Sequence, residues 1–145
     1  MSIKKSNIKI PLFLKIFIGI AWLSLFIFII RKNPSAKTTA LKLNEMQKEA
    51  DLLLKNGGDV VFSNDLSKYG VSSLLRGISF SSLTDDIYKK DINYLASNGW
   101  DDKGSGAFCK GGIFLQFNRR AVFFKGIATV ELHMDYSAKS IRECK

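Results

Sequence analysis

Residues 127–136 read IATVELHMDY, and this stretch decides the fold because apolar and polar side chains alternate from Ala128 to Tyr136. Successive side chains of a β-strand point to opposite faces. One face therefore carries the apolar residues Ala128, Val130, Leu132, Met134 and Tyr136. The other face carries Thr129, Glu131, His133 and Asp135. The pattern predicts a strand with one buried face and one face in water.

Working back from this strand, three further runs are rich in aromatic or β-branched residues: 107–110, 113–117 and 121–124. The breaks between the runs are two or three residues long and contain Gly, Asn or basic residues, as in Gly111-Gly112 and Lys125-Gly126. Breaks of that length are typical of β-hairpins. The sequence predicts an antiparallel β-meander of three to five strands.

Two helices are predicted before the meander. The first lies within residues 33–58, begins at Ser35 or Thr38, and carries apolar residues three and four positions apart. It either packs on the core or forms a partly solvated stalk. The second begins after Thr84, whose side chain can cap it, and ends at Asn98-Gly99. With both helices on one face of the sheet, the predicted class is α+β, and the domain spans residues 59–145.

A membrane segment is predicted at residues 10–32, after a basic tail at residues 1–9. Residues 10–30 are interrupted by only one charge, Lys15, and as a helix they would span about 31 Å, close to the thickness of a bilayer core. A cleaved signal peptide is the alternative, but Arg31-Lys32-Asn33-Pro34 follows where a peptidase needs small residues. The sequence favours a retained single-pass anchor.

The formal charge of +9 first suggests a nucleic-acid binder. Residues 1–32 hold six basic residues and no acid, so the other 113 residues carry sixteen basic and thirteen acidic residues, a charge of +3. Most of the excess therefore flanks the membrane segment, and nucleic acid is not expected as a partner. Basic residues are equally frequent at both ends of that segment, so the positive-inside rule does not decide its orientation.

The two cysteines, Cys109 and Cys144, lack the spacing of a redox motif or a zinc site. In an oxidising compartment they would form a disulfide, and in cytosol they would be free thiols. We expect the disulfide to form. We also expect the C-terminal domain to lie outside the cytoplasm, in the periplasm or the extracellular space.

No catalytic, metal or cofactor signature is evident. Glu131, His133 and Asp135 share a strand face, but neighbours are about 6.6 to 6.8 Å apart, too far for all three to hold one metal ion. Asp101 and Asp102 lie in a polar turn without the spacing of a calcium loop. The expectation is a protein that is not an enzyme, with no metal and no small-molecule cofactor.

A weak partner-binding surface is predicted on the hairpins. It combines cations with an aromatic side chain that need not face the core, and comprises Lys110, Arg119, Arg120, Phe123 and Lys125. The predicted function is a membrane-anchored binding or accessory protein of the cell envelope, with the lipid bilayer and an envelope protein as partners. One alternative is a small envelope enzyme using Asp101, Asp102, Glu131 or His133. Another is a domain that faces the cytoplasm.

Overall fold

The computed structural model describes residues 11–145, with the backbone alone for residues 29–32. The predicted basic tail at residues 1–9, and Ile10 of the predicted membrane segment, lie outside the described residues. The chain divides into two compact units, Met1–Lys32 and Asn33–Lys145, called unit 1 and unit 2 below. Each unit is described by itself.

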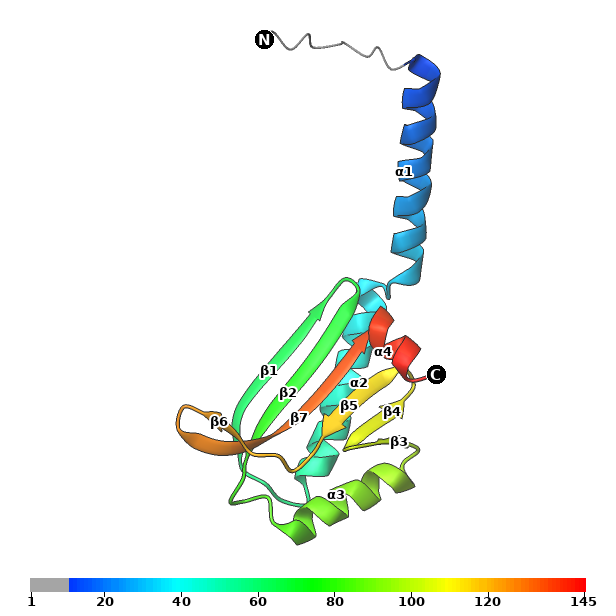
Figure 1. Cartoon of the computed structure of the whole chain (residues 1–145). Coiled ribbons are helices and arrows are strands. Elements are labelled where there is room, and N and C mark those ends of the chain that lie inside the picture. The colour runs from blue at the N-terminus through cyan, green and yellow to red at the C-terminus, as the bar shows by residue number, and fades with distance from the viewer. Residues whose placement is uncertain (1–10) are drawn as a thin grey trace, which may run out of the picture. The chain divides into compact units, whose positions relative to one another are not determined.

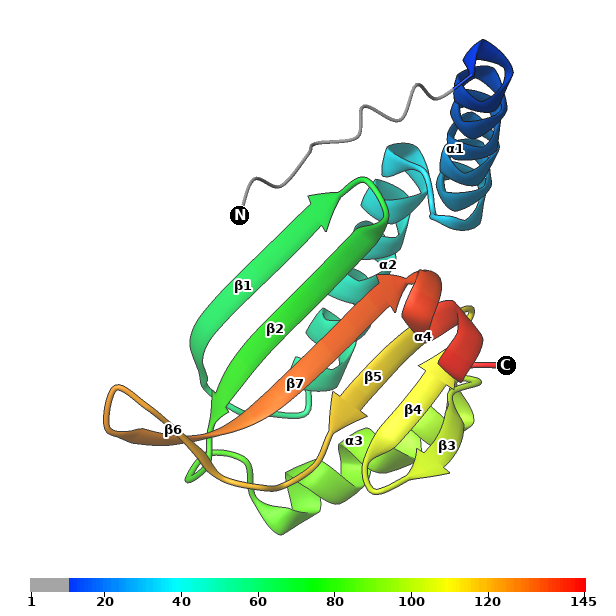
Figure 2. The same cartoon turned by 45° about the horizontal axis from the view of Figure 1, so that its top comes forward.

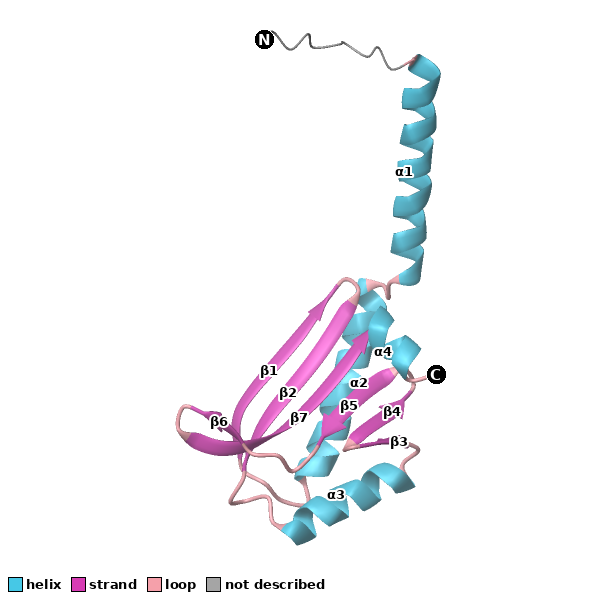
Figure 3. Ribbon diagram, viewed as in Figure 1, coloured by secondary structure: helices cyan, strands magenta, loops and turns pink. Residues whose placement is uncertain are grey.

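Unit 1 contains the helix α1 (Leu12–Lys32). Unit 2 contains three helices and seven strands (Figures 1 and 3). In chain order they are α2 (Ala36–Leu54), β1 (Val60–Lys68), β2 (Val71–Ser79), α3 (Asp85–Ser97), β3 (Asp101–Gly104), β4 (Ala107–Lys110), β5 (Ile113–Phe117), β6 (Val122–Phe124), β7 (Ile127–Ser137) and α4 (Ala138–Glu143).

The seven strands form one antiparallel sheet in the order β1-β2-β7-β5-β4-β3, with β6 also paired to β7. The α+β class is confirmed, and β7 contains the alternating stretch at residues 127–136. Val130, Leu132, Met134 and Tyr136 of its apolar face are buried, and Glu131 and His133 on the other face are exposed. Thr129, predicted on the face in water, is buried instead, and its hydroxyl donates to the Val122 carbonyl at 3.0 Å. The predicted two-residue turn at Lys125-Gly126 is also present, with φ of +48° and +83°.

The prediction of three to five strands in a simple meander is wrong. The sheet also contains the long β1–β2 hairpin and the short edge strand β3, which the predicted meander did not include. β1 shows no apolar alternation because it is an edge strand whose residues are all exposed or only partly buried. β3 reads Asp-Asp-Lys-Gly and is exposed along its whole length, so its composition resembles a turn.

α2 and α3 cover one face of the sheet (Figure 2). Ser35 caps α2 by accepting a hydrogen bond from the Thr38 N–H at 3.1 Å, and Thr84 caps α3 by accepting one from Ile87. The core between helices and sheet contains Met46, Ala50, Leu53, Leu74, Ile78, Leu95, Leu115, Phe117, Leu132 and Met134. α2 is therefore a core helix, which was the first of its two predicted alternatives.

One half-buried carboxylate ties these elements together. Glu49 of α2 accepts hydrogen bonds from Lys110 Nζ at 2.6 Å, from the Tyr94 hydroxyl at 3.2 Å and from Trp100 Nε1 at 3.4 Å. Burial, followed by the charge of Glu49, raises the pKa of Tyr94. The network fixes α2 against α3 and β4, and leaves the opposite sheet face to carry the exposed polar residues.

Among the residues whose backbone and side chains are both described, no helix is long and apolar enough to cross a membrane. The membrane segment predicted at residues 10–32 gains no support from this finding and stays a prediction.

Candidate functional site

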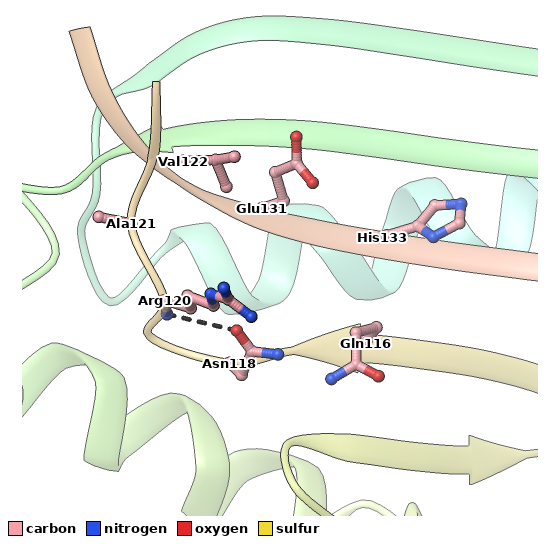
Figure 4. Close-up of a pocket in the computed structure, with 7 residues that line it drawn as sticks. All are labelled: Gln116, Asn118, Arg120, Ala121, Val122, Glu131 and His133. Carbon is pink, nitrogen blue, oxygen red and sulfur yellow. Dashed lines mark hydrogen bonds between the residues drawn. The ribbon is translucent and has the colours of Figure 1, made fainter. Parts of the chain in front are cut away.

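A groove of about 400 Å³ opens on the face of the sheet that lies opposite α2 and α3. Its floor comes from β5 and β7, and its wall comes from the segment that joins β5 to β6 (Figure 4). The lining residues are Gln116, Asn118, Arg120, Ala121, Val122, Glu131 and His133.

The groove exists because β7 changes its partner partway along its length. β5 pairs with β7 as far as Phe117 opposite Leu132, and β6 takes over with Val122 opposite Thr129. Between these two pairs the chain leaves the sheet at residues 118–121, so on this side no strand residue lies opposite Val130 or Glu131. The interruption opens a hollow at the middle of the sheet and lines it with side chains from three segments.

The groove holds two groups of opposite charge that do not pair with each other. Among the described residues, no ion pair involves Arg120 or Glu131. In Figure 4 the Arg120 guanidinium lies beside Asn118, and the Glu131 carboxylate points away from it. Both side chains belong to exposed residues, so each charge faces the water in the groove.

Two amide side chains lie on the Arg120 side of the groove. The Asn118 side-chain oxygen accepts a hydrogen bond from the Arg120 backbone N–H at 3.3 Å, so its NH₂ group is left to donate elsewhere. The Gln116 NH₂ group donates to the Ser105 carbonyl at 3.0 Å. The first bond holds the loop closed, and the second holds the edge of the floor against the β3–β4 turn.

His133 is oriented by a neighbouring strand. Its Nε2 atom lies 3.1 Å from the Ser73 hydroxyl of β2. The register places Ser73 directly opposite Asp135. Ser73, His133 and Asp135 thus lie on the same open face, but none of the hydrogen bonds described for this face joins a carboxylate to the imidazole.

The residues of the predicted enzyme alternative do not all converge. Glu131 and His133 line the groove, but Asp101 and Asp102 belong to the edge strand β3, two strands beyond β5. Asp102 accepts a hydrogen bond from the Gly104 N–H at 2.7 Å, so it has a structural role in the turn. Within residues 11–145 no group of three or more His, Cys, Asp or Glu side chains is arranged to hold a metal ion.

The predicted partner surface is divided between two places. Lys110 bonds Glu49 and lies 5.7 Å from the Trp100 ring centre, on the helix side of the sheet. Arg119 pairs with Asp85 at the start of α3, with its guanidinium 5.2 Å from the centre of the Phe80 ring. These two cations stabilise the fold. Their binding role stays a prediction.

The other three members lie close together around the β6–β7 hairpin. Phe124 packs on Phe62 of β1 with ring centres 4.2 Å apart, and its neighbour Phe123 therefore points away and is 78% exposed. Lys125 lies at the hairpin turn, 5.4 Å from the Phe124 ring centre. Arg120 precedes the hairpin in the groove wall. Exposed apolar residues Val122 and Ile127 flank this tip.

The cysteine pair lies at disulfide distance. The Sγ atoms of Cys109 in β4 and Cys144 after α4 are 2.05 Å apart, and their Cα atoms are 5.3 Å apart. Cys109 is 2% exposed, so the pair is shielded on the β4 side. The Ser140 hydroxyl, which donates to the Gly112 carbonyl at 3.0 Å, holds α4 in the same position.

Sequence reasoning assigned no role to Asp91, a carboxylate on α3 that is 2% exposed. Its Oδ1 atom accepts a hydrogen bond from the Asn56 side chain at 2.8 Å. Burial raises the pKa of Asp91 to about 6, against an opposing effect of the Asn56 hydrogen bond. The signal was present in the sequence, because Asp91 shares a helix side with Ile87 and Leu95.

Comparisons with other proteins returned no match: no family model fits the chain, and no curated protein or solved structure is significantly similar to it. The geometry of the chain itself must therefore carry any functional argument.

Proposed function

We propose that the protein is a membrane-anchored binding module of the cell envelope, which meets a protein partner through the tip of its β6–β7 hairpin. The observation that carries this proposal is the exposure of Phe123, at 78% the most exposed large apolar side chain described in unit 2. A folded domain has little reason to expose a phenylalanine in water, whereas aromatic residues are enriched where proteins meet.

The chemistry of the tip suggests the chemistry of the partner. The segment from Arg119 to Gly126 contains three cations and no acid, and Arg119 is already paired with Asp85. Arg120 and Lys125 remain beside Phe123, Val122 and Ile127. An apolar hollow with acidic groups at its rim would complement this tip.

α1 supports the membrane anchor. All described side chains of α1 are exposed, and among them only Lys15 and Ser24 are polar. Such a helix presents apolar groups to water on every side, which is typical of a helix that enters lipid. The sequence stays apolar through Ile29 and Ile30, beyond the last described side chain. Residues 12–30 include fourteen Leu, Ile and Phe, and at roughly −0.3 to −0.6 kcal/mol each they outweigh the cost of one lysine, about 3 kcal/mol.

Within unit 2, the first residues and the β6–β7 hairpin lie at opposite ends of the β2–β7 ladder. Unit 2 begins beside the β1–β2 turn, where the Gly70 N–H donates to the Pro34 carbonyl at 3.1 Å. The ladder runs from Val71 opposite Ser137 to Ser79 opposite Thr129. Eight residue steps of about 3.4 Å give about 27 Å, and the hairpin tip is farther still. The hairpin tip therefore lies at the far end of unit 2 from its first residues.

The extracytoplasmic side is the third part of the proposal. It rests on the two cysteines, because a disulfide persists in an oxidising compartment and is rare in cytosol. A phosphatase or fluorescent reporter fused after Lys145 tests the side directly. Activity of a reporter that works only in cytosol would contradict it.

A photocrosslinking residue at position 123, introduced into the full chain in native membranes, tests the partner. We expect one prominent crosslinked protein. With the probe moved to position 122, the substitution Phe123→Ala should lower the yield of that crosslink at least about tenfold, the loss typical of a contact hot spot.

Leu41→Ala provides the matched comparison, because Leu41 is also an exposed apolar residue, at 60%, but lies on α2. Loss of the crosslink in Leu41→Ala, with no effect of Phe123→Ala, would move the contact to α2 and refute the hairpin. Crosslinks to lipid alone would refute a protein partner.

A further inference from the structure

The unpaired charges of the groove carry an inference that does not require Phe123 or the membrane anchor, although Arg120 also borders the hairpin tip. We propose that the groove binds a zwitterionic α-amino carboxylate group, with Arg120 holding the carboxylate and Glu131 holding the ammonium. Such a group is carried by a free amino acid and also by the free end of a diamino acid within a larger molecule.

The placement of the two charges supports this class of ligand. Arg120 and Glu131 both line one half-open groove, yet they form no ion pair with each other or with any other described residue. Figure 4 shows their charged ends turned towards different sides of the groove. A purely anionic ligand would meet repulsion from Glu131, and a purely cationic one would meet it from Arg120. A small group that carries both charges satisfies both.

Neutral hydrogen-bonding groups also line the groove. The NH₂ group of Asn118, whose side-chain oxygen is already occupied by the Arg120 N–H, lies on the guanidinium side and can donate to a carboxylate. His133 is held by Ser73 through Nε2, which leaves its other ring nitrogen as a donor or acceptor. With Arg120 these groups supply hydrogen-bonding atoms along the same groove that Glu131 lines.

The dimensions of the groove agree with a small ligand. A volume of about 400 Å³ lies at the lower end of the range of small-molecule sites. The groove is formed by side chains and a loop that leave the sheet between two pairs of strands, so it is part of the fold itself and does not depend on the hairpin tip. Because it is partly open, it can accept the end of a longer molecule as well as a free amino acid.

The test uses the full chain in non-ionic detergent and follows ¹H–¹⁵N chemical shifts during titration with the L- and D-forms of alanine and phenylalanine. Each is compared with its methyl ester, which lacks the carboxylate, and its N-acetyl derivative, which lacks the ammonium. We expect at least one amino acid to bind with a Kd of about 10 mM or tighter, and each blocked derivative to bind about tenfold or more weakly.

Two variants assign the charges. Arg120→Gln should weaken binding of the amino acid about tenfold and leave the affinity of the methyl ester unchanged. Glu131→Gln should weaken the amino acid similarly and leave the N-acetyl derivative unchanged. Both residues are exposed, so both variants should keep the fold, and circular dichroism and the dispersion of amide shifts will check this. Phe123→Ala serves as the control, and amino-acid binding should be unaffected by it.

The two sources of the ligand group are separated by 2,6-diaminopimelic acid, titrated free and with one end in amide linkage to a peptide. Tighter binding of the linked form would indicate the end of a larger molecule, and equal or weaker binding would indicate a free amino acid. The proposal is overturned if no amino acid binds, if the blocked derivatives bind as tightly as the parent, or if neither variant changes the affinity. Amino-acid binding that persists where no hairpin crosslink forms would contradict only the proposed hairpin contact and would support the groove site.

Discussion

Replacing Asp91 with asparagine should stabilise the protein at neutral pH, and by an amount that depends on pH in a defined way. Burial raises the pKa of Asp91 to about 6 from an ordinary 3.8, so the folded chain holds this proton more tightly than the unfolded chain does. The contribution of Asp91 to the free energy of unfolding is therefore greatest below pH 3.8, and it falls as the pH rises through about 6. Above that pH the loss is complete.

The size of the effect follows from the 2.2 units between those two pKa values, 6 minus 3.8. At 1.36 kcal/mol per unit the full loss is about 3 kcal/mol. The carboxamide of Asp91→Asn would keep the shape and could still accept the 2.8 Å hydrogen bond from Asn56. A carboxamide and a protonated carboxyl are both neutral, and each has one donating and one accepting group. The free energy of unfolding of the variant should therefore exceed that of the natural protein by only about 0.6 kcal/mol at pH 4, and by about 3 kcal/mol at pH 7.5.

Urea unfolding from pH 4 to pH 8, followed by the fluorescence of the buried Trp100, measures this difference on the full chain in non-ionic detergent. Subtracting the two proteins at each pH removes the titration of every other group. Asp51→Asn, at an exposed carboxylate on α2, is the control and should change stability by less than about 0.5 kcal/mol at every pH. A difference for Asp91→Asn that stays constant with pH, or a variant less stable at pH 7.5, would refute the reasoning.

Three further changes test the fold at separate places. Replacing Cys109 and Cys144 by Ser should lower the free energy of unfolding by about 3.8 kcal/mol, because the pair is separated by 35 residues. A reducing agent should lower the stability of the natural protein by the same amount, which checks that loss of the disulfide is the cause. Gly77→Ala should cost about 1 to 3 kcal/mol in denaturant unfolding, since a Cβ would lie 2.0 Å from the Phe62 ring, and Phe62→Ala in the same chain should remove most of that cost. Asp65→Asn should lower stability by about 1 kcal/mol at pH 7; because a hydrogen bond from a neighbouring guanidinium lowers the pKa of Asp65, the difference should vanish in acid unfolding curves as the pH falls below 3.8.

The parts of the fold that the sequence predicted share one physical property: the signal for each lies within one short segment of the chain. β7 alternates because one face packs on the helices and the other meets water. α2 and α3 are marked by their caps, Ser35 and Thr84, whose hydrogen bonds are local. The turn at Lys125-Gly126 is equally local.

The β1–β2 hairpin could not be predicted in the same way. β1 carries the polar residue Asp65, and what satisfies this side chain is Arg76 on another strand and Gln47 on a helix. Such pairing across distant segments leaves no period in the sequence. The seven-strand sheet therefore emerged only from the tertiary structure.

The groove shows the same division between local and distant information. Alternation placed Glu131 and His133 on one exposed face, and this arrangement is present in the structure. It could not bring Arg120 and Asn118 to that face, because their positions depend on where the chain leaves β5 and where it joins β7 again. Asp101 and Asp102 were considered with Glu131 by residue type alone, and the strand order separates them.

The interruption in the sheet also explains why the groove lies on the open face of unit 2. β7 must pair with β2 along nine residues on one side, while its other side passes from β5 to β6 across residues that have no strand opposite them. A strand that continued across this gap would fill the hollow beside Glu131 and leave no groove. The loop instead leaves Glu131 exposed and adds Arg120 at a distance from it. Arg120 and Glu131 therefore line one groove without forming an ion pair among the described residues, and the proposed ligand would pair with both.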